Sequence, residues 1–205
     1  MRTPVEALEA LIRSWPMIVE ECRCVLAAEL HYQAVVYHCL REVGGVPPGQ
    51  IGMNVKMWIE DVESDFFKVL DLRKAPGFQG GFEPIPDVVI FGPDIQGDFR
   101  RRNNSNTLRQ MIMAIEIKAS ERHQGRLRAE EIIDDVLKLD AHRLEARHRG
   151  YDFLPAVIVV DTAPHLAERM TPGAVDSAKL AAEERGVCFF YLSPEEEFQR
   201  TSTTL

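Results

Sequence analysis

Residues 111–118 have the sequence Met111-Ile112-Met113-Ala114-Ile115-Glu116-Ile117-Lys118. Branched and apolar side chains dominate this run, which predicts the central strand of a sheet. Side chains alternate between the two faces of a strand, so Glu116 and Lys118 share one face and Ile115 and Ile117 the other. Charges on an otherwise apolar strand are costly to bury without a partner or a purpose. This stretch therefore predicts both the centre of the fold and a functional site near the end of the strand.

A second short apolar run, from Asp87 to Phe91, precedes residues 111–118 in the chain. Gly92-Pro93 ends this second run. If the two strands form a hairpin, the carboxylate of Asp87 can approach that of Glu116. Two facing carboxylates repel each other unless a cation or a proton lies between them. A hard divalent ion such as Mg²⁺ takes oxygen ligands and keeps waters that a phosphate can replace. Lys118 would orient the attacking water or stabilise the developing negative charge.

The remaining patterns place helices and further strands around this pair. They predict a short helix opened by Pro4, a longer one from Pro16 to Gly44, a strand over 51–59, a helix or irregular excursion over 61–74, a loop over 76–86, a polar hairpin loop around 100–106, a helix over 127–148, a strand over 156–161, a helix over 172–185 and a strand over 187–192. This order predicts one α/β domain over 1–205, with a mixed central sheet flanked by helices. The polar tail, 193–205, is expected to fray.

The longer helix near the N-terminus carries a polar residue within its apolar stripe. Ile18, Cys22 and Glu29 recur at helical spacing, and Gln33 follows one turn later. Glu29 would complete the acidic side of the pocket, or it lies partly exposed beside a wider stripe. Gln33 would bridge to the site or meet a backbone group.

The composition excludes several classes of protein. The chain has 205 residues, is 45% hydrophobic and carries a formal net charge of −8, which makes a nucleic-acid binder a poor first guess. No apolar run approaches the roughly 20 residues of a membrane helix. The first residues lack the continuous apolar core of a secretory signal, so a cytoplasmic protein without membrane contact is expected.

The charge is distributed unevenly along the chain. Residues 96–128 hold eight of the 24 basic side chains but three of the 32 acidic ones. Five of these arginines flank the charged strand: Arg100, Arg101, Arg102, Arg122 and Arg126. Basic groups beside acidic metal ligands suggest a substrate that carries phosphate. The arginine triplet alone could equally be a solvated loop, and Ser120 could contact phosphate or stabilise a turn.

Pro86-Asp87, a gap of 28 residues and Glu116-Ile117-Lys118 resemble the motif of the PD-(D/E)XK nuclease superfamily. The resemblance covers residues 17–161 and implies the restriction-endonuclease-like fold. It implies a Mg²⁺ or Mn²⁺ site built from Asp87, Glu116 and the main-chain carbonyl of Ile117. Lys118 would be the catalytic lysine, and Glu29 stands where many members place a helical glutamate.

The same resemblance implies a metal-dependent endonuclease that hydrolyses phosphodiester bonds, with DNA as the expected substrate. A homodimer is expected of members that cut both strands. The helix over 128–148 lacks the Gln-x-x-x-Tyr pair of exonuclease-like members.

Two other classes of function remain open at the level of sequence. A catalytically inactive member of the same fold could act as a binding or structural subunit, as the net charge of −8 would suit. A phosphatase or other small-molecule hydrolase could also use an α/β scaffold. Asp134 and Lys138, four residues apart on a helix, are expected to form a surface ion pair.

Overall fold

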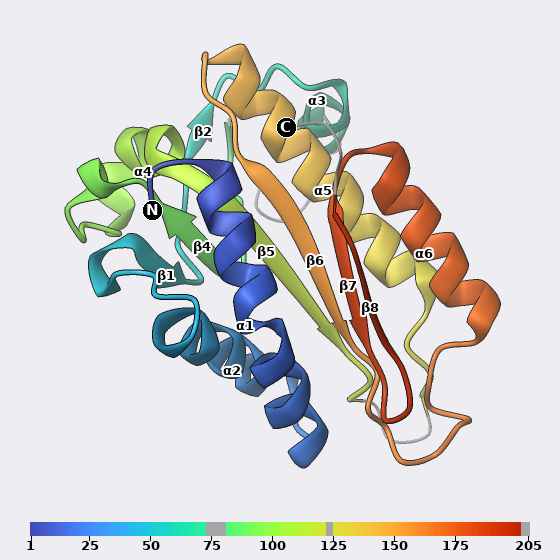
Figure 1. Cartoon of the computed structure of the whole chain (residues 1–205). Coiled ribbons are helices and arrows are strands. Elements are labelled where there is room, and N and C mark those ends of the chain that lie inside the picture. The colour runs from blue at the N-terminus through green and yellow to red at the C-terminus, as the bar shows by residue number, and fades with distance from the viewer. Residues whose placement is uncertain (73–80, 122–124, 202–205) are drawn as a thin grey trace.

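A computed structural model describes residues 1–72, 81–121 and 125–201 of the chain. Figure 1 shows an α/β fold built on one large sheet with the strand order β1-β4-β5-β6-β7-β8. These strands are β1 (Ile51–Met53), β4 (Val88–Phe91), β5 (Met111–Ala119), β6 (Leu154–Val160), β7 (Cys188–Leu192) and β8 (Glu197–Arg200). The predicted fold class, a mixed central sheet flanked by helices, is confirmed.

Strand β5 changes the direction of pairing within the sheet. It pairs antiparallel with β4, where Val88 lies opposite Ile115, and parallel with β6. Strands β6 and β7 continue the parallel part, and β1 and β8 form antiparallel edges. The register of β4 and β5 brings Asp87, one residue before Val88, to the level of Glu116.

Helices cover both faces of this sheet. On one face α1 (Pro4–Cys24) and α2 (Glu29–Glu42) pack against Ile115, Ile117 and their neighbours. On the other face α5 (Ala129–His148) and α6 (Pro172–Glu184) enclose a second apolar cluster. The remaining elements are β2 (Ile59–Glu60), which pairs with β3 (Gly81–Phe82), α3 (Asp65–Leu72), α4 (Asn104–Gln110) and three 3-10 turns at Pro48–Gln50, Pro93–Ile95 and Arg101–Asn103. Among the described residues, no helix combines the length and the apolar character needed to cross a membrane.

The predicted boundary between the first two helices was wrong. Helix α1 continues through Pro16, and the chain breaks at residues 25–28 instead. The hydroxyl of Tyr32 donates to the carbonyl of Val25 and accepts from the N–H of Ala27. This side chain satisfies two backbone groups that the break removes from the helical ladder, so the break is stable without a glycine.

Three further predictions need correction. The expected strand over 51–59 is two short strands, because Asn54 turns the chain at φ 51°. The expected polar loop contains α4, whose Thr107 and Leu108 are buried. Residues 197–200 form β8 rather than a frayed tail, since the ring of Phe198 stacks on that of Tyr191 with centroids 5.2 Å apart.

Candidate active site

Asp87 is held in place by three segments of the chain. Its Oδ2 accepts a 2.7 Å hydrogen bond from the N–H of Ile117 on β5. Its Oδ1 accepts a 2.6 Å hydrogen bond from Nε2 of Gln33 on α2. Asn54, after β1, donates to Oε1 of Gln33 over 2.9 Å and through its N–H to the carbonyl of Asp87. Burial raises the pKa of Asp87, and the hydrogen bond from Ile117 offsets part of that rise.

Glu116 faces α5 on the opposite side of β5 from the buried isoleucines, as alternation predicts. Among the described residues, the carboxylate of Glu116 makes no hydrogen bond or ion pair. Burial raises the pKa of Glu116 well above its usual range, and the carboxylates of Asp87 and Asp135 raise it further. The nearby ammonium groups of Lys118 and Lys138 offset part of that rise, so burial and repulsion together still disfavour the ionised form of Glu116.

Lys118 lies one step along the same face and pairs with two carboxylates. Its Nζ is 3.1 Å from Oδ2 of Asp135 on α5 and 3.4 Å from Oε2 of Glu29 on α2. Burial lowers the pKa of Lys118, but Asp135 and Glu29 outweigh that effect and raise it. The ammonium group therefore stays charged at neutral pH.

Asp135 is a site residue that the sequence interpretation missed. Its side chain is 6% exposed, and its Oδ1 binds Nζ of Lys138 at 2.9 Å. The ion pair of Lys138 is thus with Asp135 rather than with the predicted Asp134. A signal was present in the sequence, because Asp135 shares a helical face with Ile132 and Leu139, which are both buried.

Glu29 occupies the first turn of α2, and the structure brings it to the site as predicted. Its N–H donates a 2.9 Å hydrogen bond to Oε2 of Glu121, and its carboxylate meets Lys118. Burial raises the pKa of Glu29, and the nearby Lys118 offsets part of the rise. Gln33, left open between two roles, bridges to Asp87.

A cavity of about 350 Å³ opens beside these groups. Its walls come from β3 and the segment that follows it, from β5 and from α5. The lining residues are Phe82, Glu83, Pro84, Ile85, Pro86, Glu116, Lys118, Asp135, Lys138, Leu139 and His142. Charged and apolar side chains therefore share one concave site.

The donor chemistry of the site fits a hard cation. Over residues 1–72, 81–121 and 125–201, no group of three or more His, Cys, Asp or Glu side chains is arranged to hold a metal ion. Glu29 and Asp135 are instead drawn onto Lys118. Two carboxylates, Asp87 and Glu116, remain with the carbonyl of Ile117, and Mg²⁺ is commonly bound by one or two carboxylates with waters completing its shell. The repulsion of the Glu116 carboxylate by Asp87 and Asp135, which Lys118 and Lys138 offset in part, is the observation that fits a bound cation.

The predicted arginine triplet does not lie beside the carboxylates of the candidate site. The connection that carries Arg100, Arg101 and Arg102 joins the end of β4 to the start of β5, whereas Asp87 and Lys118 lie toward the other end of this strand pair. Arg100 binds both oxygens of Asp98 at 2.6 Å. Arg101 pairs with Glu83 and lies over the ring of Trp58, 5.8 Å from its centroid. Since Glu83 lines the cavity, Arg101 is the member of the triplet tied to its rim.

Two of the predicted phosphate-binding arginines, Arg122 and Arg126, follow β5 in the chain. Nε of Arg126 donates to the carbonyl of Ala167 over 3.2 Å, away from the carboxylates. Arg122 lies outside the described residues. The proposed phosphate contacts of both residues therefore remain predictions.

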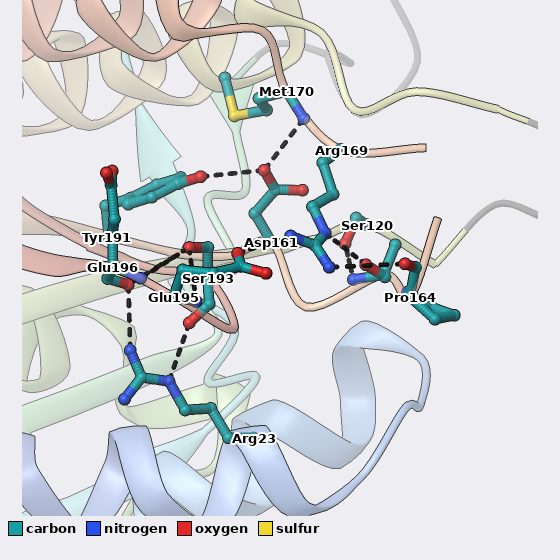
Figure 2. Close-up of polar contacts among 11 residues, drawn as sticks. Arg23, Ser120, Asp161, Pro164, Arg169, Met170, Tyr191, Ser193, Glu195 and Glu196 are labelled. Carbon is teal, nitrogen blue, oxygen red and sulfur yellow. Dashed lines mark hydrogen bonds and ion pairs between the residues drawn. The ribbon is translucent and has the colours of Figure 1, made fainter. Parts of the chain in front are cut away.

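Ser120 has a structural environment, shown in Figure 2. Its side chain is buried, and its Oγ accepts a 3.1 Å hydrogen bond from the N–H of Ala163. Nearby, Oδ2 of Asp161 accepts from the hydroxyl of Tyr191 and the N–H of Met170. These contacts fasten the segment after β6 to the ends of β5 and β7. Ser120 also lines a separate cavity of about 540 Å³, so the turn role is the one its contacts support.

No protein-family model, curated protein or solved structure matches the chain. A function therefore has to rest on the chemistry of the residues themselves. Two carboxylates, a charged lysine and a cavity next to them can bind a cation and stabilise negative charge that develops on a phosphate ester.

Proposed function

We propose that this chain is a Mg²⁺-dependent endonuclease of the PD-(D/E)XK type that hydrolyses phosphodiester bonds of DNA. One observation carries the proposal: Asp87, Glu116 and Lys118 converge at one site from two neighbouring strands. Both halves of the short motif thus come together in space with Glu29 from α2 beside them. If the motif occurred in the sequence by chance, its residues would not be expected to lie together in the folded protein.

The arrangement of the sheet supports a restriction-endonuclease-like core. Helices precede β1, which is followed in the large sheet by β4 and β5, then by α5 and β6. The sheet order β1-β4-β5-β6 keeps these strands adjacent, with the first three antiparallel and the last parallel. This resembles the family's helix, three strands, helix and strand, with β2, α3 and β3 inserted between β1 and β4.

Each polar residue then has a role in hydrolysis. Mg²⁺ held by Asp87, Glu116 and the carbonyl of Ile117 would supply Lewis-acid chemistry at the scissile phosphate. The ammonium group of Lys118 donates hydrogen bonds to the phosphate oxygens as negative charge develops there. Glu29 and Asp135 hold Lys118 in its charged form, and Gln33 with the N–H of Ile117 orients Asp87.

A cleavage assay tests the proposal. Plasmid DNA, labelled duplex and single-stranded oligonucleotides and RNA are incubated with the protein in Mg²⁺, with EDTA as the metal-free arm. Cleavage that requires Mg²⁺ is expected, and Lys118→Met and Asp87→Asn should each lower the rate by about 100-fold or more. Lys179→Met is the matched control, because Lys179 lies on α6 over the ring of Phe198.

The other outcomes are equally informative. Full activity of Lys118→Met would refute the mechanism. Turnover of a chromogenic phosphate ester without cleavage of any nucleic acid would favour a small-molecule hydrolase. Absence of all cleavage by the unmodified protein would favour a non-catalytic subunit.

A further inference from the structure

The cavity beside Glu116 and Lys118 extends well past the catalytic groups. Its volume of about 350 Å³ lies within the range of small-molecule sites, roughly 300–1,000 Å³. At its mouth Ile85 is 40% exposed, whereas Leu139 and His142 in its wall are each 2% exposed. The cavity therefore has a deep part that a phosphate bound at Lys118 would not fill.

His142 provides an unsatisfied polar atom in that deep part. Its Nε2 is buried and has no hydrogen-bond partner among the described residues. Burial lowers the pKa of His142 to about 3, so the imidazole is neutral. Asp135, Leu139 and His142 follow one another at helical spacing, which places them along one side of α5. A buried polar atom without a partner is unfavourable, and a rotation of the imidazole toward the cavity would let a bound group with a complementary polar edge satisfy it.

The other walls of the deep part suit a flat, uncharged group. The cavity is lined by Phe82 at the end of β3 and by Pro84, Ile85 and Pro86 in the segment that follows. The charged members of the lining are three carboxylates against two lysines, which disfavours a second anionic group. A nucleobase matches these walls, because it has apolar faces, a polar edge and no charge.

The charge of the protein also favours recognition of a base over recognition of the phosphate backbone. Arg100 and Arg101 are already paired with Asp98 and Glu83, and the chain carries a net charge of −8. Phosphate contacts alone are therefore a weak source of affinity for nucleic acid. Stacking and edge contacts to an exposed base would supply affinity that does not depend on positive charge.

We propose that this cavity accepts the unstacked base of a nucleotide next to the scissile phosphate. The preferred substrate class is then single-stranded or locally unpaired nucleic acid, since a paired base must first leave its stack to enter. This inference rests on the proposed nuclease function and names its substrate class.

A binding experiment in EDTA tests the cavity without requiring cleavage. The probe is a single-stranded oligonucleotide that contains 2-aminopurine, whose fluorescence increases when the base leaves the stack. Titration with the unmodified protein should increase the emission at least twofold. Ile85→Trp, which places a larger ring at the mouth, should weaken this binding at least fivefold.

Two further variants keep the test informative. Ile12→Trp is the matched control, because Ile12 is 36% exposed on α1 and does not line the cavity, and it should bind as the unmodified protein does. His142→Phe removes the unsatisfied nitrogen while keeping a ring, and should weaken binding of the 2-aminopurine probe. Circular dichroism of each variant reports whether it folds.

Cleavage assays then separate the two proposals. In Mg²⁺ the single-stranded or mismatched substrate should be cut at least tenfold faster than the matched duplex, with Ile85→Trp removing most of that preference. Mg²⁺-dependent cleavage without a fluorescence change or a preference would overturn the cavity proposal and leave the nuclease proposal standing. A fluorescence change that Ile85→Trp abolishes, without any cleavage, would support the cavity and overturn the nuclease. If the probe does not bind and nothing is cleaved, both are wrong.

Discussion

Gln33 holds Asp87 through a 2.6 Å hydrogen bond between its Nε2 and Oδ1 of the carboxylate. The other carboxylate oxygen is bound by the N–H of Ile117, so both oxygens are oriented by the protein. Partners that orient a ligand are typically worth 10- to 100-fold in metal affinity or activity. Gln33 is therefore a positioning residue, although it lies on a different element from the motif.

Replacing Gln33 with leucine should lower kcat/KM about 10- to 100-fold and raise the Mg²⁺ concentration needed for half-maximal rate. The reason is that Asp87 would lose one of the two contacts that orient it. Mg²⁺ titrations of cleavage measure both effects. Gln199→Leu, on the exposed edge strand β8, is the control and should match the unmodified protein. A variant at Gln33 with an unchanged Mg²⁺ requirement would contradict the assigned role.

The central part of the fold could be predicted because its signals are local. The apolar run that ends with Glu116 and Lys118 fixes a buried strand, and the alternation of its side chains fixes the face on which the charges lie. Asp87 was found in the same way, because it begins a short apolar run. Glu29 was found through a predicted helical stripe that the structure interrupts at residues 25–28, so its position at the start of α2 was not predicted.

Other features depend on contacts between segments distant in sequence. The break after α1 is stabilised by Tyr32, whose hydroxyl reaches back to Val25 and Ala27. Asp135 became a site residue because α5 packs over β5 and brings it to Lys118. The helical spacing of Asp135 with its apolar neighbours indicates that Asp135 is buried. No local pattern around residue 135 indicates that its partner is Lys118.

Lys118 and Asp135 should be coupled energetically. The side chain of Asp135 is 6% exposed, and removing Lys118 would leave it with Lys138 but without its nearest buried cation. Lys118→Met should therefore lower the free energy of unfolding by about 1–3 kcal/mol. In an Asp135→Asn background the same substitution should cost less, with a coupling energy of about 1–3 kcal/mol.

Urea unfolding of the two single variants and the double variant at neutral pH measures this coupling. Lys179→Met, on α6, serves as a surface control and should leave stability within about 0.5 kcal/mol. Costs that simply add in the double variant would show that the contact between Lys118 and Asp135 contributes no net stability.

His142 should make the protein less stable in acid. Burial lowers the pKa of His142 in the folded state to about 3, from its usual value of 6.5. Between these values the unfolded chain binds a proton at His142 that the folded chain does not bind. Unfolding is then favoured as pH falls below 6.5, by at most about 1.4 kcal/mol per pH unit, or about 2 kcal/mol by pH 5.

Unfolding curves from about pH 7.5 to about pH 5 test this dependence. Because all other titrating groups are shared, the difference between the unmodified protein and His142→Phe isolates the contribution of His142. The variant should lose less stability on acidification, whereas His38→Gln, at an exposed position on α2, should follow the unmodified protein. Equal pH slopes for His142→Phe and the unmodified protein would contradict a neutral buried imidazole.

Glu116 should destabilise the protein when no cation is bound. Burial raises the pKa of Glu116, the neighbouring Asp87 and Asp135 raise it further, and Lys118 and Lys138 offset part of the rise, so the ionised form is penalised in the folded protein. Glu116→Gln keeps the shape of the side chain and removes its charge. In EDTA the variant should therefore be more stable than the unmodified protein by about 1–2 kcal/mol.

Addition of Mg²⁺ should reverse this order. Binding to the folded state alone stabilises a protein by about 2.7 kcal/mol at 100 times the dissociation constant, and the variant would lose most of that gain with one of its two carboxylate ligands. Urea unfolding in EDTA and in Mg²⁺ measures both effects, with Glu9→Gln on the exposed side of α1 as the control. If Glu116→Gln were the less stable protein in EDTA, the carboxylate would contribute a favourable interaction rather than repulsion, and the cation site would lose its main support.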